Sequence, residues 1–259
     1  MLKGLYVAYT GMINEQNRMD ILTNNLANAS TVGYKKEGST SEAFDEILTV
    51  KIRDASVGRR LVQPVGTNNP GVKVGENYTD FTQGSFRVTG NTYDLALAGE
   101  GFFAVEFTNK AGDTSTMYTR AGQFTLDRDG YLRTDDGDYV LDQQNRRIRV
   151  NPLYESQIDA NGTITQNGRT VARIQVADFE DYNYLEKYAE TYYRPVEGAR
   201  LTEGTAEVKS GYLEMANVQI VSEMVNLISI ARAYESNQKI IQTYDNTLET
   251  AVNQLGKLG

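Results

Sequence analysis

The stretch that decides the fold lies at the end of the chain: GYLEMANVQIVSEMVNLISIARAYESNQKIIQTYDNTLETAVNQLG, Gly211 to Gly256. Neither Gly nor Pro interrupts it, and apolar side chains recur at every seventh position: Leu213, Ile220, Leu227, Tyr234, Ile241, Leu248 and Leu255. A second set falls four positions after three of these: Met224, Ala231 and Val252. This 3-4 spacing is typical of a helix that packs along another helix. We expect Asn217 to cap the start of the helix, and Gly256, followed by Lys257, to end it.

A second pattern with the same period occupies residues 2–29. Its apolar positions are Leu5, Met12, Met19 and Leu26, with Ala8, Leu22 and Ala29 between them. Gly4 and Gly11 each lower intrinsic helix stability by about 1 kcal/mol, so this helix needs packing partners. Two helices in an ordinary core would explain either pattern alone. Two long patterns at opposite ends of the chain favour a paired, coiled-coil-like stalk.

The middle of the chain has the texture of a mainly antiparallel β domain. Short runs such as Phe102–Phe107 and Arg169–Val176 are rich in aromatic and branched residues. Asp-Gly and Asn-Gly pairs, which mark hairpin turns, punctuate them at 129–130, 136–137, 161–162 and 167–168. Residues 42–63 predict either a short helix or a strand pair, and the Pro- and Gly-rich residues 64–75 predict a loop. The Tyr-rich residues 179–194 predict packing or a subunit interface.

The predicted fold class is therefore α+β, in three parts. Residues 1–40 and 209–259 form the helical stalk, residues 41–75 an extended connector, and residues 76–208 the β-rich outer domain.

Composition excludes much common chemistry. The 259 residues contain no Cys, His or Trp, and the formal net charge is −8. We therefore expect no thiol or imidazole catalysis, no metal site and no cofactor. The acidic balance argues against a nucleic-acid partner. The start of the chain lacks the pattern of a cleaved secretory signal, and no apolar run predicts a membrane span.

Residues that follow the first helix carry a recognisable signature: Asn25, Leu26, Ala27, Asn28, Thr31, Gly33, Tyr34 and Lys35. This signature resembles the N-terminal motif of the bacterial flagellar axial proteins, which are the rod, hook and hook-junction subunits. The segments 211–218 and 231–235 resemble the C-terminal motif of the rod and hook branch. The segments 99–103 and 118–124 resemble that branch's middle domain.

The resemblance implies a structural role in the flagellar basal body, with subunits polymerising into a hollow rod that transmits torque to the hook. It implies self-association, rod and hook subunits as partners, export by the flagellar apparatus without a cleaved signal, and envelope rings around the rod. The side chains expected at the assembly interface are Leu5, Met12, Met19, Leu22, Leu26, Leu227, Tyr234, Ile241 and Leu248. The terminal helices are expected to be largely disordered before assembly.

Three alternatives stay open at this point. The length of segment 45–72 favours a distal rod subunit, but proximal rod and hook subunits share the same motifs. A more distant alternative is a carbohydrate-active β enzyme carried on an oligomerisation stalk.

Overall fold

The computed structural model describes residues 2–52, 62–109 and 112–255. The chain divides into two compact units. The helical unit is drawn from residues 1–26, 37–78 and 220–259, and the β unit from residues 27–36 and 79–219. Helices occur near both ends of the chain and antiparallel strands lie between them, which confirms the α+β class.

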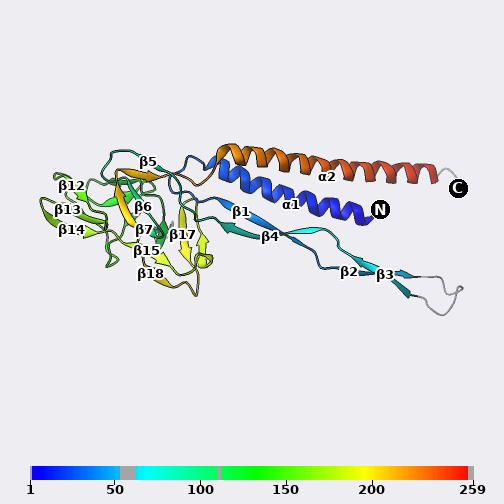
Figure 1. The fold of residues 1–259 in the computed structure, drawn as a ribbon, viewed down its shortest axis with the longest axis horizontal. Coiled ribbons are helices and arrows are strands. Elements are labelled where there is room, and N and C mark those ends of the chain that lie inside the picture. The colour runs from blue at the N-terminus through cyan, green and yellow to red at the C-terminus, as the bar shows by residue number, and fades with distance from the viewer. Residues whose placement is uncertain (1, 53–61, 110–111, 256–259) are drawn as a thin grey trace. The chain divides into compact units, whose positions relative to one another are not determined.

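Two antiparallel helices, α1 (Leu2–Ala27) and α2 (Ile220–Leu255), lie side by side in the helical unit (Figure 1). Glycines allow them to approach closely. A Cβ atom on Gly4 would lie 2.2 Å from the Tyr244 hydroxyl oxygen, and one on Gly11 would lie 3.0 Å from Asn237 Nδ2. Gly4 thus lies opposite Tyr244 and Gly11 opposite Asn237, as expected for antiparallel helices. By this register the start of α1 lies opposite residue 246 or so, and the last turns of α2 extend beyond it.

On the side of α2 that faces α1, the predicted seven-residue repeat through Leu227, Tyr234, Ile241 and Leu248 is retained. The second row of covered side chains, however, lies three residues after each of these positions rather than four. Its members are half-buried or buried: Ile230, Asn237, Tyr244 and Ala251. Met224 and Val252, which the sequence placed on this side, are exposed. We refer to the side formed by Leu227, Ile230, Tyr234, Asn237, Ile241, Tyr244 and Leu248 as the seam. Because the seam contains polar as well as apolar residues, the spacing of apolar residues alone did not identify its members correctly.

The expected cap of α2 is also wrong. The helix begins at Ile220, three residues after Asn217, and Asn217 binds other parts of the β unit instead. Leu213 lies outside the helix, in a strand, and Ile220 is exposed. Gly256 and Lys257, expected at the helix end, lie outside the described residues.

Two strand pairs complete the helical unit. Strand β1 (Glu37–Ala43) pairs with β4 (Val72–Thr79), and β2 (Ile47–Ile52) pairs antiparallel with β3 (Val62–Asn68). The strand-pair alternative for residues 42–63 is confirmed where these residues are described, but the loop expected at 64–75 is wrong. Pro64 is tolerated because each strand of a two-stranded ribbon is an edge strand, and the register shifts beside its partner Val50.

The strand pairs pack along α1. Asn14 Oδ1 accepts a hydrogen bond from Ser41 Oγ (3.0 Å), and Lys3 Nζ donates one to Thr49 Oγ1 (3.2 Å). Contacts with the strands on one side and α2 on another leave a third side of α1 uncovered, where Tyr6, Tyr9 and Ile13 are exposed.

The β unit is built around a nine-stranded antiparallel sheet with the order β16-β17-β8-β7-β11-β10-β9, in which β15 also pairs with β7 and β18. Its strands are β7 (Phe102–Thr108), β8 (Thr114–Thr119), β9 (Phe124–Leu126), β10 (Leu132–Thr134), β11 (Tyr139–Val140), β15 (Val176–Phe179), β16 (Leu185–Lys187), β17 (Tyr192–Pro195) and β18 (Leu201–Glu203).

Smaller sheets complete the β unit. A three-stranded sheet contains β12 (Ser156–Ile158), β13 (Thr163–Gln166) and β14 (Arg169–Arg173). Two-stranded pairs join β6 (Leu95–Ala98) to β19 (Glu207–Ser210) and β5 (Phe86–Val88) to β20 (Tyr212–Glu214). The four Asp-Gly and Asn-Gly pairs each fall between two paired antiparallel strands, which confirms the predicted hairpin turns.

Two apolar clusters form the core of the β unit. The larger is centred on Leu95, Phe103 and Phe124, with the rings of Phe103 and Phe124 edge to face at 5.2 Å. The smaller joins Phe102, Phe179 and Tyr193, so part of the Tyr-rich segment serves packing as expected. Tyr184, in the short 3-10 turn η2 (Tyr182–Tyr184), and Tyr188 stay exposed. In the described ranges, no helix has an apolar stretch long enough to span a membrane.

Candidate functional site: a buried junction and an apolar helix face

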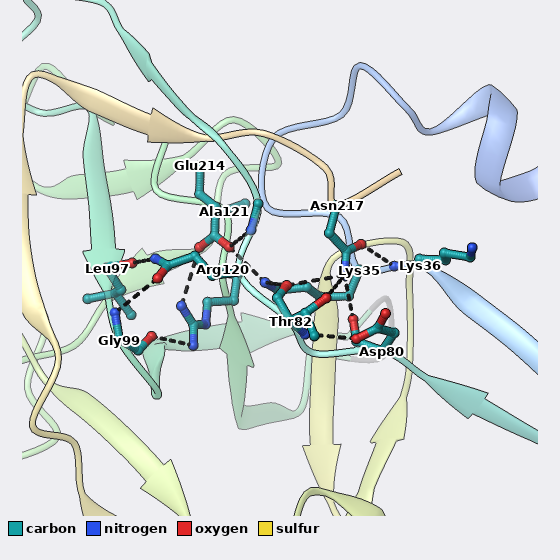
Figure 2. Close-up of polar contacts among 12 residues, drawn as sticks. Lys35, Lys36, Asp80, Thr82, Leu97, Gly99, Arg120, Ala121, Glu214 and Asn217 are labelled. Atoms are coloured by element: carbon teal, nitrogen blue, oxygen red, sulfur yellow. Dashed lines mark hydrogen bonds and ion pairs between the residues drawn. The ribbon is translucent and has the colours of Figure 1, made fainter. Parts of the chain in front are cut away.

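A buried charged cluster joins the segment by which the chain enters the β unit to the segment by which it leaves. Glu214, in β20, is fully buried, and Lys35 and Arg120 are almost fully buried beside it. Lys35 Nζ donates to Glu214 Oε1 at 2.7 Å, and Arg120 Nη1 donates to Glu214 Oε2 at 3.3 Å (Figure 2). We call Lys35, Arg120 and Glu214 the junction triad.

Backbone groups supply further hydrogen bonds to the junction triad, although the buried Arg120 Nε has no hydrogen-bond partner among the described residues. Glu214 Oε1 also accepts from the Gly84 amide at 3.0 Å. Lys35 Nζ donates to the Thr82 carbonyl at 2.8 Å, and Arg120 Nη2 donates to the Gly99 carbonyl at 2.8 Å. Buried charges need such partners because desolvation costs several kcal/mol per ion. One carboxylate thereby fixes the relative positions of four chain segments within the β unit.

Burial lowers the pKa of Lys35, because the charged ammonium loses its hydration. The carboxylate of Glu214 opposes this shift, and the nearby Arg120 adds to it. Two cations thus share a single anion in a dry environment. The arrangement is suited to holding the chain in one geometry. In the described part of the chain, no group of three or more acidic side chains is placed to hold a metal ion.

Gly33 explains how Lys35 reaches the triad. Its φ is +69°, a conformation that glycine adopts at little cost. A Cβ atom there would lie 2.3 Å from the Ala121 amide nitrogen, so no side chain fits. The Gly33 amide donates to the Glu214 carbonyl at 2.8 Å, which brings residues 33–35 beside β20.

The asparagines of the signature bind backbone. Asn25 is fully buried; its Nδ2 donates to the Glu37 carbonyl (2.7 Å) and its Oδ1 accepts from the Glu37 amide (2.9 Å). The side chain thus acts like a short piece of β-strand between the end of α1 and the start of β1. Asn28 Oδ1 accepts a hydrogen bond from Thr31 Oγ1 at 3.1 Å.

The remaining signature residues differ in how far they are buried. Tyr34 is fully buried, with the Lys187 ammonium 4.3 Å from its ring centre. Leu26 is half-buried and Ala27 is exposed.

Asn217 repeats the role of Asn25 inside the β unit. Its Oδ1 accepts from the Lys36 amide at 2.7 Å, and its Nδ2 donates to the Asp80 carbonyl at 2.7 Å (Figure 2). Arg120, Glu214 and Asn217 lie within the motifs quoted from the sequence, but the contacts of Glu214 with Lys35 and Arg120, and of Asn217 with Lys36, were not predicted. No periodic signal links residues that lie about a hundred positions apart in the chain.

The side chains expected at an assembly interface lie mostly on the inner sides of the helical pair. All nine are half-buried: Leu5, Met12, Met19, Leu22, Leu26, Leu227, Tyr234, Ile241 and Leu248. A different set of apolar residues is exposed on α2: Val221, Met224, Val225 and Ile228. At about 100° per residue these four fall on the side of α2 opposite the seam, and we call them the outer stripe. Their spacing was readable in the sequence, but the longer heptad pattern masked it.

Replacing Glu214 by Gln should strongly destabilise the β unit. The variant would leave two buried cations without their anion, so we expect the free energy of unfolding to fall by about 3–5 kcal/mol. Urea unfolding followed by tyrosine fluorescence would measure the loss. The matched control is Glu186→Gln, because Glu186 pairs with Arg194 at the surface and should cost less than about 1 kcal/mol. Equal losses in the two variants would contradict a special role for the buried triad.

Lys35 should also make stability depend on pH. Its folded-state pKa lies below the unfolded value of 10.5, so between these values the unfolded chain binds more protons and stability rises with pH. We expect the free energy of unfolding of the wild-type protein, relative to that of a Lys35→Met variant, to increase as the pH rises from 7 towards 10.5. Urea unfolding of both proteins across this range tests the sign. A difference that shrinks with pH would contradict it.

Comparison with known proteins matches three parts of the chain to one family. The family described as flagella basal body rod protein matches residues 5–35, the flagellar hook protein FlgE/F/G D1 domain matches 96–168, and the flagellar basal body rod FlgEFG protein C-terminal domain matches 209–255. Lys35, Arg120 and Glu214 fall one in each of these three matches.

Individual relatives extend the match to the whole chain. The flagellar basal-body rod protein FlgG of Bacillus subtilis (strain 168) is 33% identical over 98% of this chain and 99% of its own length. FlgF of Caulobacter vibrioides is 34% identical and the hook-basal body complex protein FlhO of B. subtilis is 32% identical, each over 100% of both chains. The chain therefore belongs to the flagellar basal-body rod family, and it is a structural subunit of the flagellar rod or hook rather than an enzyme.

Proposed function

We propose that this protein is a rod subunit of the distal type, which polymerises into the hollow drive shaft that carries torque from motor to hook. The outer stripe is the observation that carries the proposal of a polymer. Val221 alone is 77% exposed, and its three companions on the stripe are at least half exposed. An apolar helix face of this kind is stable in water only when another surface covers it.

The last turns of α2 supply a second uncovered surface. They extend beyond the start of α1, and Val252 in these turns is 69% exposed. Leu248 is half-buried near the point where α1 begins. We propose that helices of neighbouring copies cover both surfaces, and that the half-buried edges of Leu5, Met12, Met19, Leu227 and the other expected interface residues are covered with them. A heterologous contact that does not close produces a helical tube.

The distal type is supported by the connector. Residues 45–72 have a length that suits the extra segment expected in the distal branch. They include the described parts of β2 and β3, and these strands expose Ile47, Leu48 and Val65. A ribbon of two strands has little stability of its own, so a neighbouring subunit is its natural support. A proximal rod subunit is the second candidate, because relatives with two different rod-protein names, FlgG and FlgF, match the chain at similar identity. Export by the flagellar apparatus before assembly, with largely disordered ends, and surrounding envelope rings belong to the same proposal.

Charges placed on the outer stripe should prevent polymerisation. A Val221→Asp, Val225→Asp double variant should stay folded, because neither side chain is covered within the chain, yet the protein concentration needed for filaments should rise at least about tenfold. Electron microscopy of concentrated protein measures this, and circular dichroism checks the fold. The matched control, Ser222→Asp with Asn226→Asp, adds the same charge on the same turns beside the stripe. Filaments of the stripe variant at the control's concentration would contradict the proposal.

Deletion of the gene should separate distal from proximal type. Without a distal subunit, isolated basal bodies should keep the inner part of the rod and lack its outer part and the hook. A proximal subunit would instead be needed for any rod to extend. Electron cryomicroscopy of basal bodies from the deletion strain measures the rod length. A basal body with no rod at all would contradict the distal assignment while leaving membership of the rod unaffected.

A further inference from the structure

A rigid loop in the β unit displays two apolar side chains. Leu153 is 86% exposed and Tyr154 is half exposed, directly before β12. The loop is braced by the buried side chain of Gln166: its Oε1 accepts from the Asn151 amide (3.1 Å), and its Nε2 donates to the carbonyls of Asn151 (2.9 Å) and Tyr154 (3.2 Å). Apolar groups held rigidly in water lose little further freedom on binding. We call Leu153 and Tyr154 the knob.

Elsewhere in the β unit lies a pocket of about 270 Å³, large enough for one aromatic side chain and part of another residue. Ile174, Val176 and Ala206 contribute apolar side chains to its otherwise polar lining, and Gly204 adds no side chain that would fill it. Arg173 and Glu203 also line the pocket and carry opposite charges. Arg173 Nε donates to the Asn161 carbonyl at 3.0 Å, which uses one guanidinium nitrogen and holds the group in place.

The knob and the pocket lie at opposite ends of one strand. Gln166, which braces the knob, is the last residue of β13, whereas Asn161, which lines the pocket, comes just before its start. The step from Asn161 to Gln166 covers Gly162 and the four residues of β13, about 16 Å at 3.3 Å per residue. The knob thus lies away from the pocket of its own chain, and a contact between the two features would join different copies.

We propose that the knob of one copy binds in the pocket of a neighbouring copy in the assembled rod. The Tyr154 ring would pack on Val176 and Ala206 beneath the Arg173 guanidinium, an arrangement that favours a cation–π contact. The Tyr154 hydroxyl would donate a hydrogen bond to the Glu203 carboxylate, and Leu153 would cover the rim. The contact is heterologous, since each copy offers a knob to one neighbour and a pocket to another. It rests on the proposed function, because it needs copies arranged in a polymer.

The absence of cysteine from the chain allows a direct test by disulfide cross-linking. Full-length Tyr154→Cys protein and full-length Thr205→Cys protein, distinguished by tags, are mixed, assembled at high concentration and oxidised. Thr205 is an exposed residue that lines the pocket. We expect a cross-linked heterodimer. The matched control replaces the second protein with Leu201→Cys, a similarly exposed position outside the pocket lining, and should give at least about tenfold less heterodimer.

The outcomes separate this proposal from the proposed function. Filaments with equal cross-linking to Thr205→Cys and Leu201→Cys would overturn the knob contact and leave the rod assignment standing. If no filaments form, the rod polymer is contradicted, and the knob contact that depends on it is overturned with it. As a second measurement, Tyr154→Ser should raise the concentration needed for filaments about tenfold, whereas Tyr188→Ser, at another exposed tyrosine, should leave it unchanged.

Discussion

The β unit depends on one buried carboxylate that serves two cations. Glu214 accepts hydrogen bonds from Lys35 and Arg120 where water is excluded, so its charge is neutralised only if both partners arrive in the correct geometry. Such a cluster contributes little net stability, because desolvation offsets much of the Coulomb attraction. The cluster instead favours one packing of the β unit, because other packings are destabilised. Any packing that leaves one of the three charges buried without a partner loses several kcal/mol, so the chain has a single way to close the unit.

In the helical unit, polar side chains lie between the helices and apolar side chains lie exposed on the outside. Its seam contains Asn237 and Tyr244 among the apolar residues, whereas the outer stripe, on the far side of α2, is wholly apolar. A pair of helices buries too little surface to be strongly stable, and a polar seam lowers the gain further. The outer stripe is thus left exposed within the chain and is available for the subunit contacts proposed above. This distribution is expected of a subunit whose helices become fully stable only in an assembly.

Sequence periodicity was enough to predict the two helices, their pairing and the β hairpins, because each is a local pattern. It did not predict which side of α2 is covered, because two neighbouring rows of apolar residues fit the same spacing. Met224 fits a 3-4 repeat as well as Ile230 does, and only the position of α1 decides which of them is covered. It also failed at residues 64–75, where Pro64 predicts a loop although an isolated ribbon tolerates proline. The junction triad had no local pattern at all, since a salt bridge between Lys35 and Glu214 is defined by the closed fold and not by spacing.

The junction triad brings together the three separate segments that match the family. Lys35, Arg120 and Glu214 lie in the three matched regions, which the sequence keeps far apart. In the structure these regions meet at one carboxylate, so a change in any of them must be accommodated by the other two. Surface strands such as β14 and β18 carry no such constraint, because their side chains are mostly exposed. The three matched segments therefore share one buried charge cluster in the β unit, and two of them also contain the helices of the helical unit.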